Sequence, residues 1–269
     1  MKDVKLVLCD LDGTLLDDNK NVDLDIKNIV LKKNLLFTLV SGRNLGQVLT
    51  YVDALDIKIP FITNNGASVC LGKERLYGLF IDRHCIEDIL MFLMNYNISF
   101  LVNCDSGVYS YGQDSLIQQF KLRSIGKCPV FDAVPISSLV EENIEKIIMS
   151  HPDDELMTEI SNILNEKFPK THCVRSEGRA FTLTNKSASK GSSVRWLLDH
   201  LGIEKEHVIA FGDNFNDISM FKSVKYSVAM DNAASEVKRN AIYITKSNNE
   251  RGVSYFIEHY VKCKRLFQI

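Results

Sequence analysis

Two aspartates at the end of the first apolar run of the chain could take part in nucleophilic and acid–base chemistry. Asp10 directly follows the run 4–9, Asp12 comes two positions later, and Gly13 lets the chain turn away. An ionised carboxylate can attack phosphorus without a base to activate it. A second carboxylate can protonate the leaving oxygen and later take a proton from water. The simpler interpretation is that both acids are ordinary loop residues at a strand end.

Further polar residues follow later apolar runs. Ser41-Gly42-Arg43 comes after the run 35–40, and the segment 212–217 (Gly-Asp-Asn-Phe-Asn-Asp) comes after the run 208–211. Lys190 opens a later segment with helical spacing. Each of these alone is typical of a turn or of a solvated lysine. Together they offer carboxylates for a hard cation beside hydroxyl, amide and ammonium donors for an anion.

The chemistry that this set favours is phosphoryl transfer. Several carboxylates brought together repel one another unless a cation lies among them, and Mg²⁺ prefers oxygen ligands and keeps substrate phosphate oxygens in its shell. Ser41, the backbone amides near it and Lys190 are suited to hold a phosphate. Positioning and charge neutralisation would then dominate catalysis. A calcium loop is excluded, because Gly13 stands at the fourth position of the acidic stretch and that loop needs glycine at the sixth.

The elements that must position these residues follow an α/β pattern. The apolar runs 4–9, 35–40 and 59–63 predict strands, and segments with helical spacing lie between them. This β-α-β-α-β order predicts a parallel sheet, and the pattern resumes at Lys190 and continues through the strand 208–211. The carboxyl ends of parallel strands share one edge, where open α/β sheets place their ligands. Residues far apart in the sequence are therefore expected to meet there.

The middle of the chain breaks this regular pattern. From about residue 83 to 182, strands and helices follow one another without βαβ regularity. The expected organisation is a core made of residues 1–82 and 183–269 with an α+β domain inserted at 83–182, and a chain of 269 residues is long enough for both. Within the insertion, the stretch after Tyr111 as far as Pro135 is expected to be rich in turns.

Composition narrows the class of protein. A net charge of −2, with 45% hydrophobic and 25% charged residues, predicts a soluble globular protein with no electrostatic case for nucleic acid or an anionic membrane. No apolar run approaches the ~18 residues of a membrane span. The first strand begins at once, so no signal peptide is expected. Seven scattered cysteines without a C-x-x-C pair favour free thiols in a reducing cytoplasm.

These motifs resemble those of the haloacid dehalogenase superfamily and, within it, the Cof-type phosphatases. The resemblance covers the whole chain. It rests on Asp10-Leu11-Asp12-Gly13-Thr14-Leu15, Ser41-Gly42-Arg43, Lys190-Gly191 and Gly212-Asp213-Asn214-Phe215-Asn216-Asp217, supported by Asn64-Asn65-Gly66-Ala67, Val228-Ala229-Met230 and Asn248-Asn249-Glu250-Arg251-Gly252-Val253. It implies a Rossmann-like core with a mostly parallel sheet, and an inserted cap of type C2 that governs substrate specificity.

The resemblance also implies a role for each motif residue. Asp10 would be the nucleophile that forms an aspartyl-phosphate, and Asp12 would be the general acid and base. Magnesium would be held by the Asp10 carboxylate, the Asp12 backbone carbonyl and Asp213. Asp217 would orient Lys190 or a metal-bound water. The phosphate would be bound by the Leu11 backbone, Ser41, Gly42, Lys190 and Asn216.

The expected function is therefore magnesium-dependent hydrolysis of a small phosphorylated metabolite. Sugar phosphates are the common substrates of the resembled family, with flavin mononucleotide and pyridoxal phosphate as alternatives. Candidate contacts to the substrate in the cap are Tyr109, Tyr111, Arg175, Glu177 and Arg179. A phosphotransferase or phosphomutase with the same aspartyl-phosphate remains an alternative, as does a non-catalytic regulatory binding protein. No nucleic acid, membrane or obligate protein partner is evident.

Overall fold

The computed structural model of the chain describes residues 1, 3–176 and 178–262. It divides into two compact units. Unit 1 comprises Met1–Arg43, Val48–Tyr77 and the chain from Ser189 onward, and unit 2 comprises Asn44–Gln47 and Gly78–Ala188. Apart from the short segment 44–47, unit 2 is one continuous insertion into unit 1.

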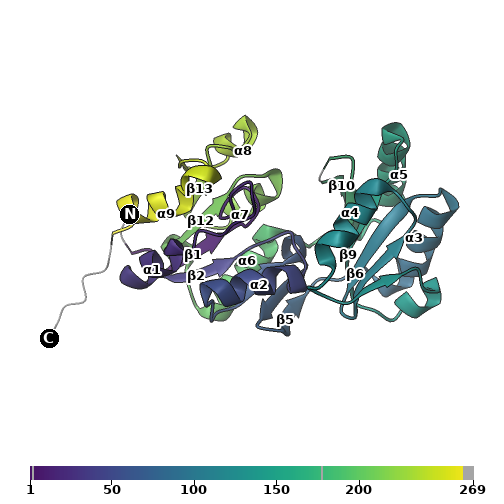
Figure 1. Cartoon of the computed structure of the whole chain (residues 1–269), viewed down its shortest axis with the longest axis horizontal. Helices are drawn as coiled ribbons and strands as arrows, with labels where there is room; N and C mark the ends of the chain where they lie inside the picture. Colours follow the sequence, from purple (N-terminus) through teal and green to yellow (C-terminus); the bar gives the residue numbers. More distant parts are fainter. Residues whose placement is uncertain (2, 177, 263–269) are drawn as a thin grey trace. The chain divides into compact units, whose positions relative to one another are not determined.

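Unit 1 is built on a parallel sheet of five strands in the order β14-β13-β12-β1-β2. The strands are β1 (Leu6–Cys9), β2 (Leu36–Leu39), β12 (Val208–Gly212), β13 (Tyr226–Ala229) and β14 (Tyr243–Ile244). Every residue of β1 is buried, as expected for a parallel strand covered on both faces. Figure 1 shows β1 and β12 side by side within this unit.

A smaller sheet continues from the β2 edge. A parallel bridge between Val40 and Ile62 connects the end of β2 to β3 (Phe61–Thr63). The 3₁₀ turn η1 (Asn64–Gly66) then leads into β4 (Ser68–Leu71), which pairs antiparallel with β3, and β5 (Glu74–Gly78) completes the order β3-β4-β5. The third predicted strand thus joins the parallel sheet through a single bridge.

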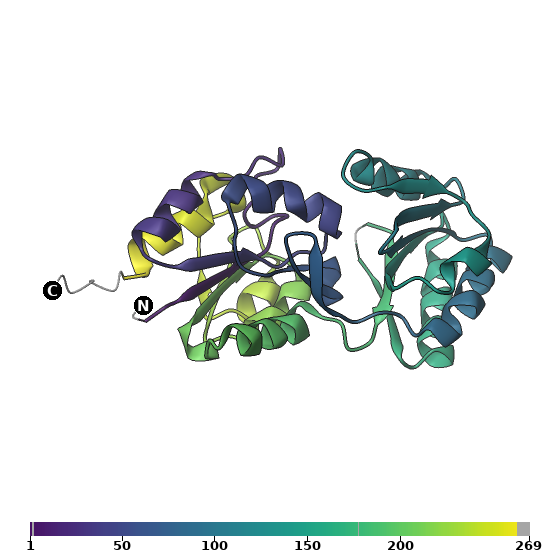
Figure 2. The ribbon, with the colours of Figure 1, turned by 90° about the horizontal axis from the view of Figure 1, so that it is seen from below.

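Helices cover both faces of the five-stranded sheet. They are α1 (Asp25–Lys32), α2 (Leu45–Leu55), α6 (Lys190–Leu201), α7 (Ile218–Phe221), α8 (Ser235–Arg239) and α9 (Gly252–Tyr260), with the 3₁₀ turns η3 (Lys205–His207), η4 (Phe215–Asp217) and η5 (Asn248–Glu250). Apolar side chains of α6, α7 and α8 pack with Leu6, Leu8 and Ala210 in one cluster. On the opposite face, Phe256 of α9 contacts Phe211, and α9 packs beside α1 (Figure 2).

Unit 2 has its own sheet of six strands in the order β10-β11-β9-β6-β7-β8. The strands are β6 (Ser99–Cys104), β7 (Gly107–Tyr111), β8 (Val130–Asp132), β9 (Ile144–Ser150), β10 (Thr171–Arg175) and β11 (Phe181–Asn185), and the helices are α3 (Arg83–Asn95), α4 (Ser115–Ser124) and α5 (Asp154–Lys167), with the 3₁₀ turn η2 (Ile136–Leu139). All neighbours pair antiparallel except β7 and β8. Helices α3 and α5 pack on one face in a core that includes Leu90, Phe100 and Ile160.

Two features of unit 2 differ from the sequence-based expectation. The turn-rich stretch after Tyr111 contains helix α4, whose start is capped by the Asp114 side chain accepting from the N–H groups of Leu116 and Ile117. Ile117 is the only apolar residue that α4 buries fully, which explains its weak apolar periodicity. The second feature is β11, which crosses the expected boundary at 182/183 because its pairing with β9 and β10 keeps it in unit 2.

No described helix is long and apolar enough to cross a membrane. The six cysteines within the described part of the chain are all free thiols.

Candidate active site

The predicted site residues lie at the carboxyl ends of three neighbouring strands and at the start of one helix. Asp10 directly follows β1, Ser41 lies two residues beyond β2, and Asp213 directly follows β12. Lys190 is the first residue of α6. Because β2, β1 and β12 are adjacent and parallel, the chain segments that leave them start from the same edge of the sheet.

Lys190 joins two of these segments. Its Nζ donates to Oδ1 of Asp10 and to Oδ1 of Asp217, both at 2.6 Å, and the side chain is only 1% exposed. Ser189 and Ser192 form reciprocal hydrogen bonds that fix the first turn of α6. Burial alone would lower the pKa of Lys190, but the two carboxylates more than offset it and raise this pKa above its ordinary value. Lys190 is therefore a fixed cation.

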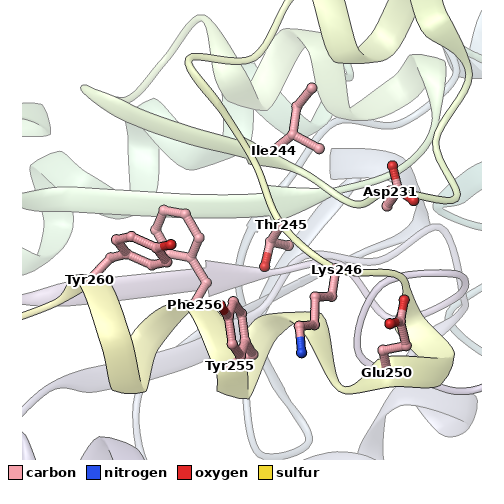
Figure 3. A pocket seen from close by; sticks show the side chains of 8 residues that line it. All are labelled: Asp231, Ile244, Thr245, Lys246, Glu250, Tyr255, Phe256 and Tyr260. Carbon is pink, nitrogen blue, oxygen red and sulfur yellow. The ribbon is translucent and has the colours of Figure 1, made fainter.

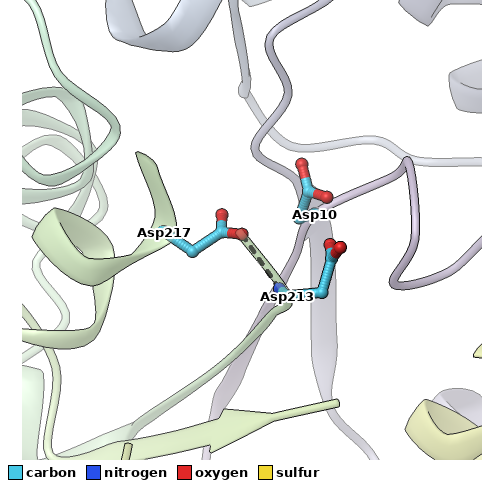
Figure 4. Close-up of side chains that lie close together, drawn as sticks. All are labelled: Asp10, Asp213 and Asp217. Carbon is cyan, nitrogen blue, oxygen red and sulfur yellow. Dashed lines mark hydrogen bonds between the residues drawn. The ribbon is translucent and has the colours of Figure 1, made fainter. Parts of the chain in front are cut away.

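Three carboxylates surround this cation. One oxygen atom each of Asp10, Asp213 and Asp217 lie within 4.8 Å of one another (Figure 4). Burial raises the pKa of Asp10 well above its usual range, with Asp217 and Asp213 adding to the effect and Lys190 opposing it. Burial and the charge of Asp217 raise the pKa of Asp213 from 3.8 to about 6. Three acids with one ammonium leave a surplus of negative charge, which favours a bound cation.

Asp217 uses both of its oxygens for internal hydrogen bonds. Oδ1 accepts from Lys190, and Oδ2 accepts from the backbone N–H groups of Asp213 at 3.0 Å and Asn214 at 2.9 Å. These contacts hold the loop after β12 in place and leave this carboxylate less free than Asp10 or Asp213 to bind a metal. Asp217 thus holds the Lys190 ammonium in place.

Asp213 is held from the loop after β1. Thr14 Oγ1 donates to Oδ1 of Asp213 at 2.8 Å. Gly13 has a φ of +79°, and a Cβ atom there would lie 2.3 Å from Oδ2 of Asp213. Position 13 therefore requires glycine both for its backbone conformation and for the space that Asp213 occupies. Sequence reasoning gave Thr14 no role of its own, although it directly follows Gly13 in the first motif.

Ser41 is buried within the loop after β2. It is 1% exposed, and its Oγ accepts from the backbone N–H of Arg43 at 3.1 Å. Its own N–H donates to the carbonyl of Ile62 at 2.9 Å, and its carbonyl accepts from the N–H of Asn65 at 3.0 Å. The loop is thus tied to the end of β3 and to η1.

Asn65 connects two predicted phosphate ligands. Its Oδ1 accepts from Nδ2 of Asn216 at 2.8 Å, and a Cβ atom at Gly42 would lie 2.8 Å from the same oxygen. Asn65 has a φ of +58°, a left-handed conformation that asparagine tolerates better than most residues. The Asn64-Asn65-Gly66 turn therefore positions Asn216, a contribution that sequence reasoning did not assign.

Asp12 lies apart from the three-carboxylate cluster and is paired with Arg43. Arg43 Nε donates to Oδ2 and Nη2 to Oδ1, both at 2.7 Å, and Lys20 Nζ donates to Oδ1 at 3.0 Å. Burial alone would raise the pKa of Asp12, but Arg43 and Lys20 lower it from 3.8 to about 2. Neither cation was predicted to have a role, although Arg43 belongs to the second motif.

Comparison with known proteins decides the family. The model of the haloacid dehalogenase-like hydrolases matches residues 7–257. The chain is a haloacid dehalogenase-like hydrolase. A relative from Haemophilus influenzae is 30% identical over 263 residues, which cover 94% of this chain and 97% of its own. The 5-amino-6-(5-phospho-D-ribitylamino)uracil phosphatase of Bacillus subtilis is 29% identical over 285 residues, 95% of this chain and 97% of its own.

Solved structures agree with this family. A haloacid dehalogenase-like hydrolase from B. subtilis superposes with a TM-score of 0.83 and 26% identity over 96% of this chain and 100% of its own. One from Bacteroides thetaiotaomicron superposes with a TM-score of 0.85. These findings confirm the predicted superfamily with its Cof-type branch, the α/β fold and an enzyme of the phosphatase class.

The described residues of this hydrolase that were expected to touch substrate from the cap have partners inside unit 2. The Tyr111 hydroxyl donates to the carbonyl of Val134, and the side chain is 5% exposed. The Tyr109 ring stacks on Phe131. Arg175 pairs with Asp154 and Arg179 with Asp114, each at 2.7 Å. Glu177 lies outside the described residues. Tyr111 is therefore a core residue, and the other described members of the set remain predictions.

A hollow of about 320 Å³ on unit 1 of the hydrolase lies away from this site (Figure 3). Its lining includes Lys246, Tyr255 and Phe256, from α9 and the segment before it. None of the predicted site residues lines it, so it is not a candidate for the phosphate site.

Proposed function

We propose that this hydrolase is a magnesium-dependent phosphatase that removes phosphate from small metabolites through a phosphorylated Asp10. The observation that carries the proposal is the buried Lys190, held between Asp10 and Asp217 with Asp213 beside them. This arrangement offers a nucleophile, a fixed positive charge and a surplus of carboxylate oxygen at one sheet edge. Phosphoryl transfer needs these three elements.

The donor set fits magnesium. The group of side chains in the described part of the chain that could hold a metal, Asp10, Asp213 and Asp217, consists of carboxylates, and hard divalent cations prefer oxygen ligands. Burial raises the pKa values of Asp10 and Asp213, and the neighbouring carboxylates add to the effect, so a bound cation would favour their ionised forms. Magnesium would be held by the Asp10 and Asp213 carboxylates and the Asp12 backbone carbonyl. When bound, it neutralises negative charge on the carboxylates and on the substrate phosphate.

The phosphate of the substrate would be bound by groups from three segments. The Leu11 backbone, the Ser41 hydroxyl and the backbone at Gly42 supply uncharged donors, and Lys190 supplies the positive charge. Asn216, held by Asn65, would add an amide donor. Oriented donors of this kind stabilise the charge that develops on the phosphoryl oxygens.

Asp10 and Asp12 would divide the chemistry between them. Asp10 attacks phosphorus, the bond from phosphorus to the leaving oxygen breaks, and Asp12 gives that oxygen a proton. Asp12 then takes a proton from a water molecule, which attacks the aspartyl-phosphate and releases inorganic phosphate. Lys190 favours the ionised form of Asp10, against the effect of burial, and fixes its direction through the 2.6 Å hydrogen bond.

For the substrate we favour a phosphate ester of a sugar or sugar alcohol. The B. subtilis relative that is 29% identical is named for a phosphoribityl compound, a sugar-alcohol phosphate. Residues 83–182, within unit 2, would choose among such metabolites as an inserted cap. Related enzymes could then keep the same catalytic core and act on different metabolites through changes in that insertion alone.

The test is phosphate release from a panel of sugar phosphates with magnesium and after its removal by a chelator. The wild type should release phosphate only with the metal, and Asp10→Asn should release none while keeping its thermal unfolding midpoint. Asp56→Asn, a change of an exposed carboxylate that pairs with Lys58, is the matched control and should remain fully active. Full activity of Asp10→Asn would refute the mechanism. A phosphorylated acceptor in place of free phosphate would favour the phosphotransferase.

A further inference from the structure

The Asp12 carboxylate is oriented by a neighbour that the proposed mechanism has not used. We infer that Arg43 is a positioning residue, whose guanidinium fixes the direction of the Asp12 carboxylate for proton transfer with the leaving oxygen. The inference rests on the proposed function, in which Asp12 is the general acid and base. It predicts that Arg43 acts on catalysis through Asp12 and not through the phosphate.

Arg43 and Asp12 are joined by two hydrogen bonds. Nε of Arg43 donates to Oδ2 of Asp12 and Nη2 donates to Oδ1, each at 2.7 Å. Two parallel hydrogen bonds from a planar guanidinium define the plane of the carboxylate. The Asp12 side chain is 42% exposed and that of Arg43 is 18% exposed, so the more buried partner sets the position of the more exposed one.

Arg43 is itself fixed on several sides. Its Nη1 donates to the Tyr51 hydroxyl at 3.0 Å, and its Cζ lies 5.1 Å from the centre of the Tyr51 ring. Its backbone N–H donates to Ser41 Oγ at 3.1 Å, and its carbonyl accepts from the N–H of Asn64 at 2.8 Å. The loop that carries the proposed phosphate ligand Ser41 therefore also carries the group that orients Asp12.

Lys20 touches the same carboxylate but does not define its direction. It makes one contact, 3.0 Å to Oδ1 of Asp12, and its side chain is 57% exposed. An exposed lysine with a single contact costs conformational entropy to hold and leaves the plane of the carboxylate undefined. Lys20→Gln is thus a matched control, because it removes a cation from Asp12 without removing the planar contact.

The test compares two substrates that differ in their need for a proton. When a pentose phosphate reacts, the pentose leaves as an alkoxide and depends on the general acid. When p-nitrophenyl phosphate reacts, the leaving group is a stable phenolate. Arg43→Gln should lower kcat/KM for the pentose phosphate, which reports the steps up to departure of the alcohol, by ~10–100-fold, the scale of a misplaced acid–base group. For p-nitrophenyl phosphate kcat/KM should fall by less than ~3-fold, because the departing phenolate needs no proton, whereas kcat also includes the attack of water that Asp12 assists.

Two further variants isolate the planar contact. Arg43→Lys keeps the charge and should recover only part of the pentose phosphate activity, since lysine cannot make both hydrogen bonds. Lys20→Gln should stay within ~3-fold of the wild type on both substrates, because exposed ion pairs contribute little. Equal losses for Lys20→Gln and Arg43→Gln would overturn the inference.

Comparison with Asp12→Asn separates a role through Asp12 from a role in folding. If Arg43 acts through Asp12, the double variant Asp12→Asn/Arg43→Gln is no slower on the pentose phosphate than Asp12→Asn alone. Additive losses, or equal losses of kcat/KM on both substrates for Arg43→Gln, would mean that Arg43 supports the Ser41 loop or the fold instead. Full pentose phosphate activity of Asp12→Asn is a distinct outcome, which would refute the acid–base assignment in the proposed function itself.

Discussion

The Lys190 ammonium lies 2.6 Å from Oδ1 of Asp10, although the two residues are 180 positions apart in the chain. It lies at the same distance from Oδ1 of Asp217. All three side chains are at least nine-tenths buried. Both buried carboxylates are stabilised by the same cation, because its loss would leave their negative charge buried without a partner.

Removal of this cation should affect both stability and activity. Lys190→Met is expected to lower the free energy of unfolding by ~3–5 kcal/mol at neutral pH, the cost of breaking a buried ion pair, and to abolish phosphate release. Urea unfolding monitored by circular dichroism measures the first effect. The double variant Lys190→Met/Asp217→Asn should be more stable than the sum of the single changes, since it removes one of the two stranded carboxylates. Strict additivity would contradict the shared ion pair.

Asp213 predicts a pH dependence in the metal-free protein. Its folded pKa of about 6 lies above its ordinary 3.8, so its proton binds the folded state more tightly. The stabilisation from this proton is complete below about pH 4 and is lost as the pH rises through about 6. Near pH 7.5, Asp213→Asn should therefore have a free energy of unfolding about 1–2 kcal/mol higher than that of the wild type, a difference that allows for the partial exposure of Asp213. Near pH 4 the two proteins should be equally stable.

The same two proteins are then compared with magnesium bound. The wild type should gain thermal stability with magnesium near pH 7.5, and Asp213→Asn should gain little, because a neutral amide is a poorer ligand than a carboxylate. Unfolding is measured after treatment with a chelator and again with magnesium added. Equal stability of the metal-free wild type and Asp213→Asn near pH 7.5 would show that the Asp213 charge does not strain the site.

Thr14 should act on metal affinity through Asp213. Its hydroxyl donates to Oδ1 of Asp213 at 2.8 Å. Thr14→Val keeps the shape and removes the donor, so the magnesium concentration for half-maximal activity should rise by ~10–100-fold. Thr14→Ser, which keeps the hydroxyl, serves as the control and should resemble the wild type. An unchanged magnesium requirement in Thr14→Val would mean that Asp213 is held by other contacts.

Gly42 predicts a steric effect that reaches Asn216. A Cβ atom at position 42 would lie 2.8 Å from Oδ1 of Asn65, which accepts from Asn216. Gly42→Ala should cost no more than ~1 kcal/mol of stability, because the atom it meets is the end of the Asn65 side chain, which can turn away. It should raise KM because this movement displaces Asn216. Combining it with Asn65→Ala should restore stability but not KM. If Gly42→Ala keeps the wild-type KM, Asn65 does not position a substrate ligand.

The sequence was informative about strand ends. The apolar runs that precede Asp10, Ser41 and Asp213 predicted three strands, and parallel order is enough to bring their ends to one edge. The pairing of Asp12 with Arg43 was not predictable, because it depends on the conformations of two loops. Asn65 was likewise missed, since its left-handed backbone, which places its side chain against Gly42, has no sequence pattern beyond a turn.

Unit 2 was harder to predict for a different reason. Helix α4 begins at a capping residue, Asp114, but buries few apolar side chains, so hydrophobic periodicity hardly marks it. The end of the insertion depends on β11, whose membership in unit 2 follows from pairing with β9 and not from its composition. Local pattern therefore predicts elements with a strong apolar face better than it predicts helices and boundaries that depend on tertiary contacts.

The central claim is that Asp10 carries the phosphoryl group during turnover. The most direct measurement is mass spectrometry of the enzyme quenched in acid while it turns over a sugar phosphate with magnesium. The account predicts a phosphoryl group on the peptide that contains Asp10, present in the wild type and absent in Asp10→Asn. A phosphoryl group on another residue, or phosphate release at the wild-type rate by Asp10→Asn, would contradict it.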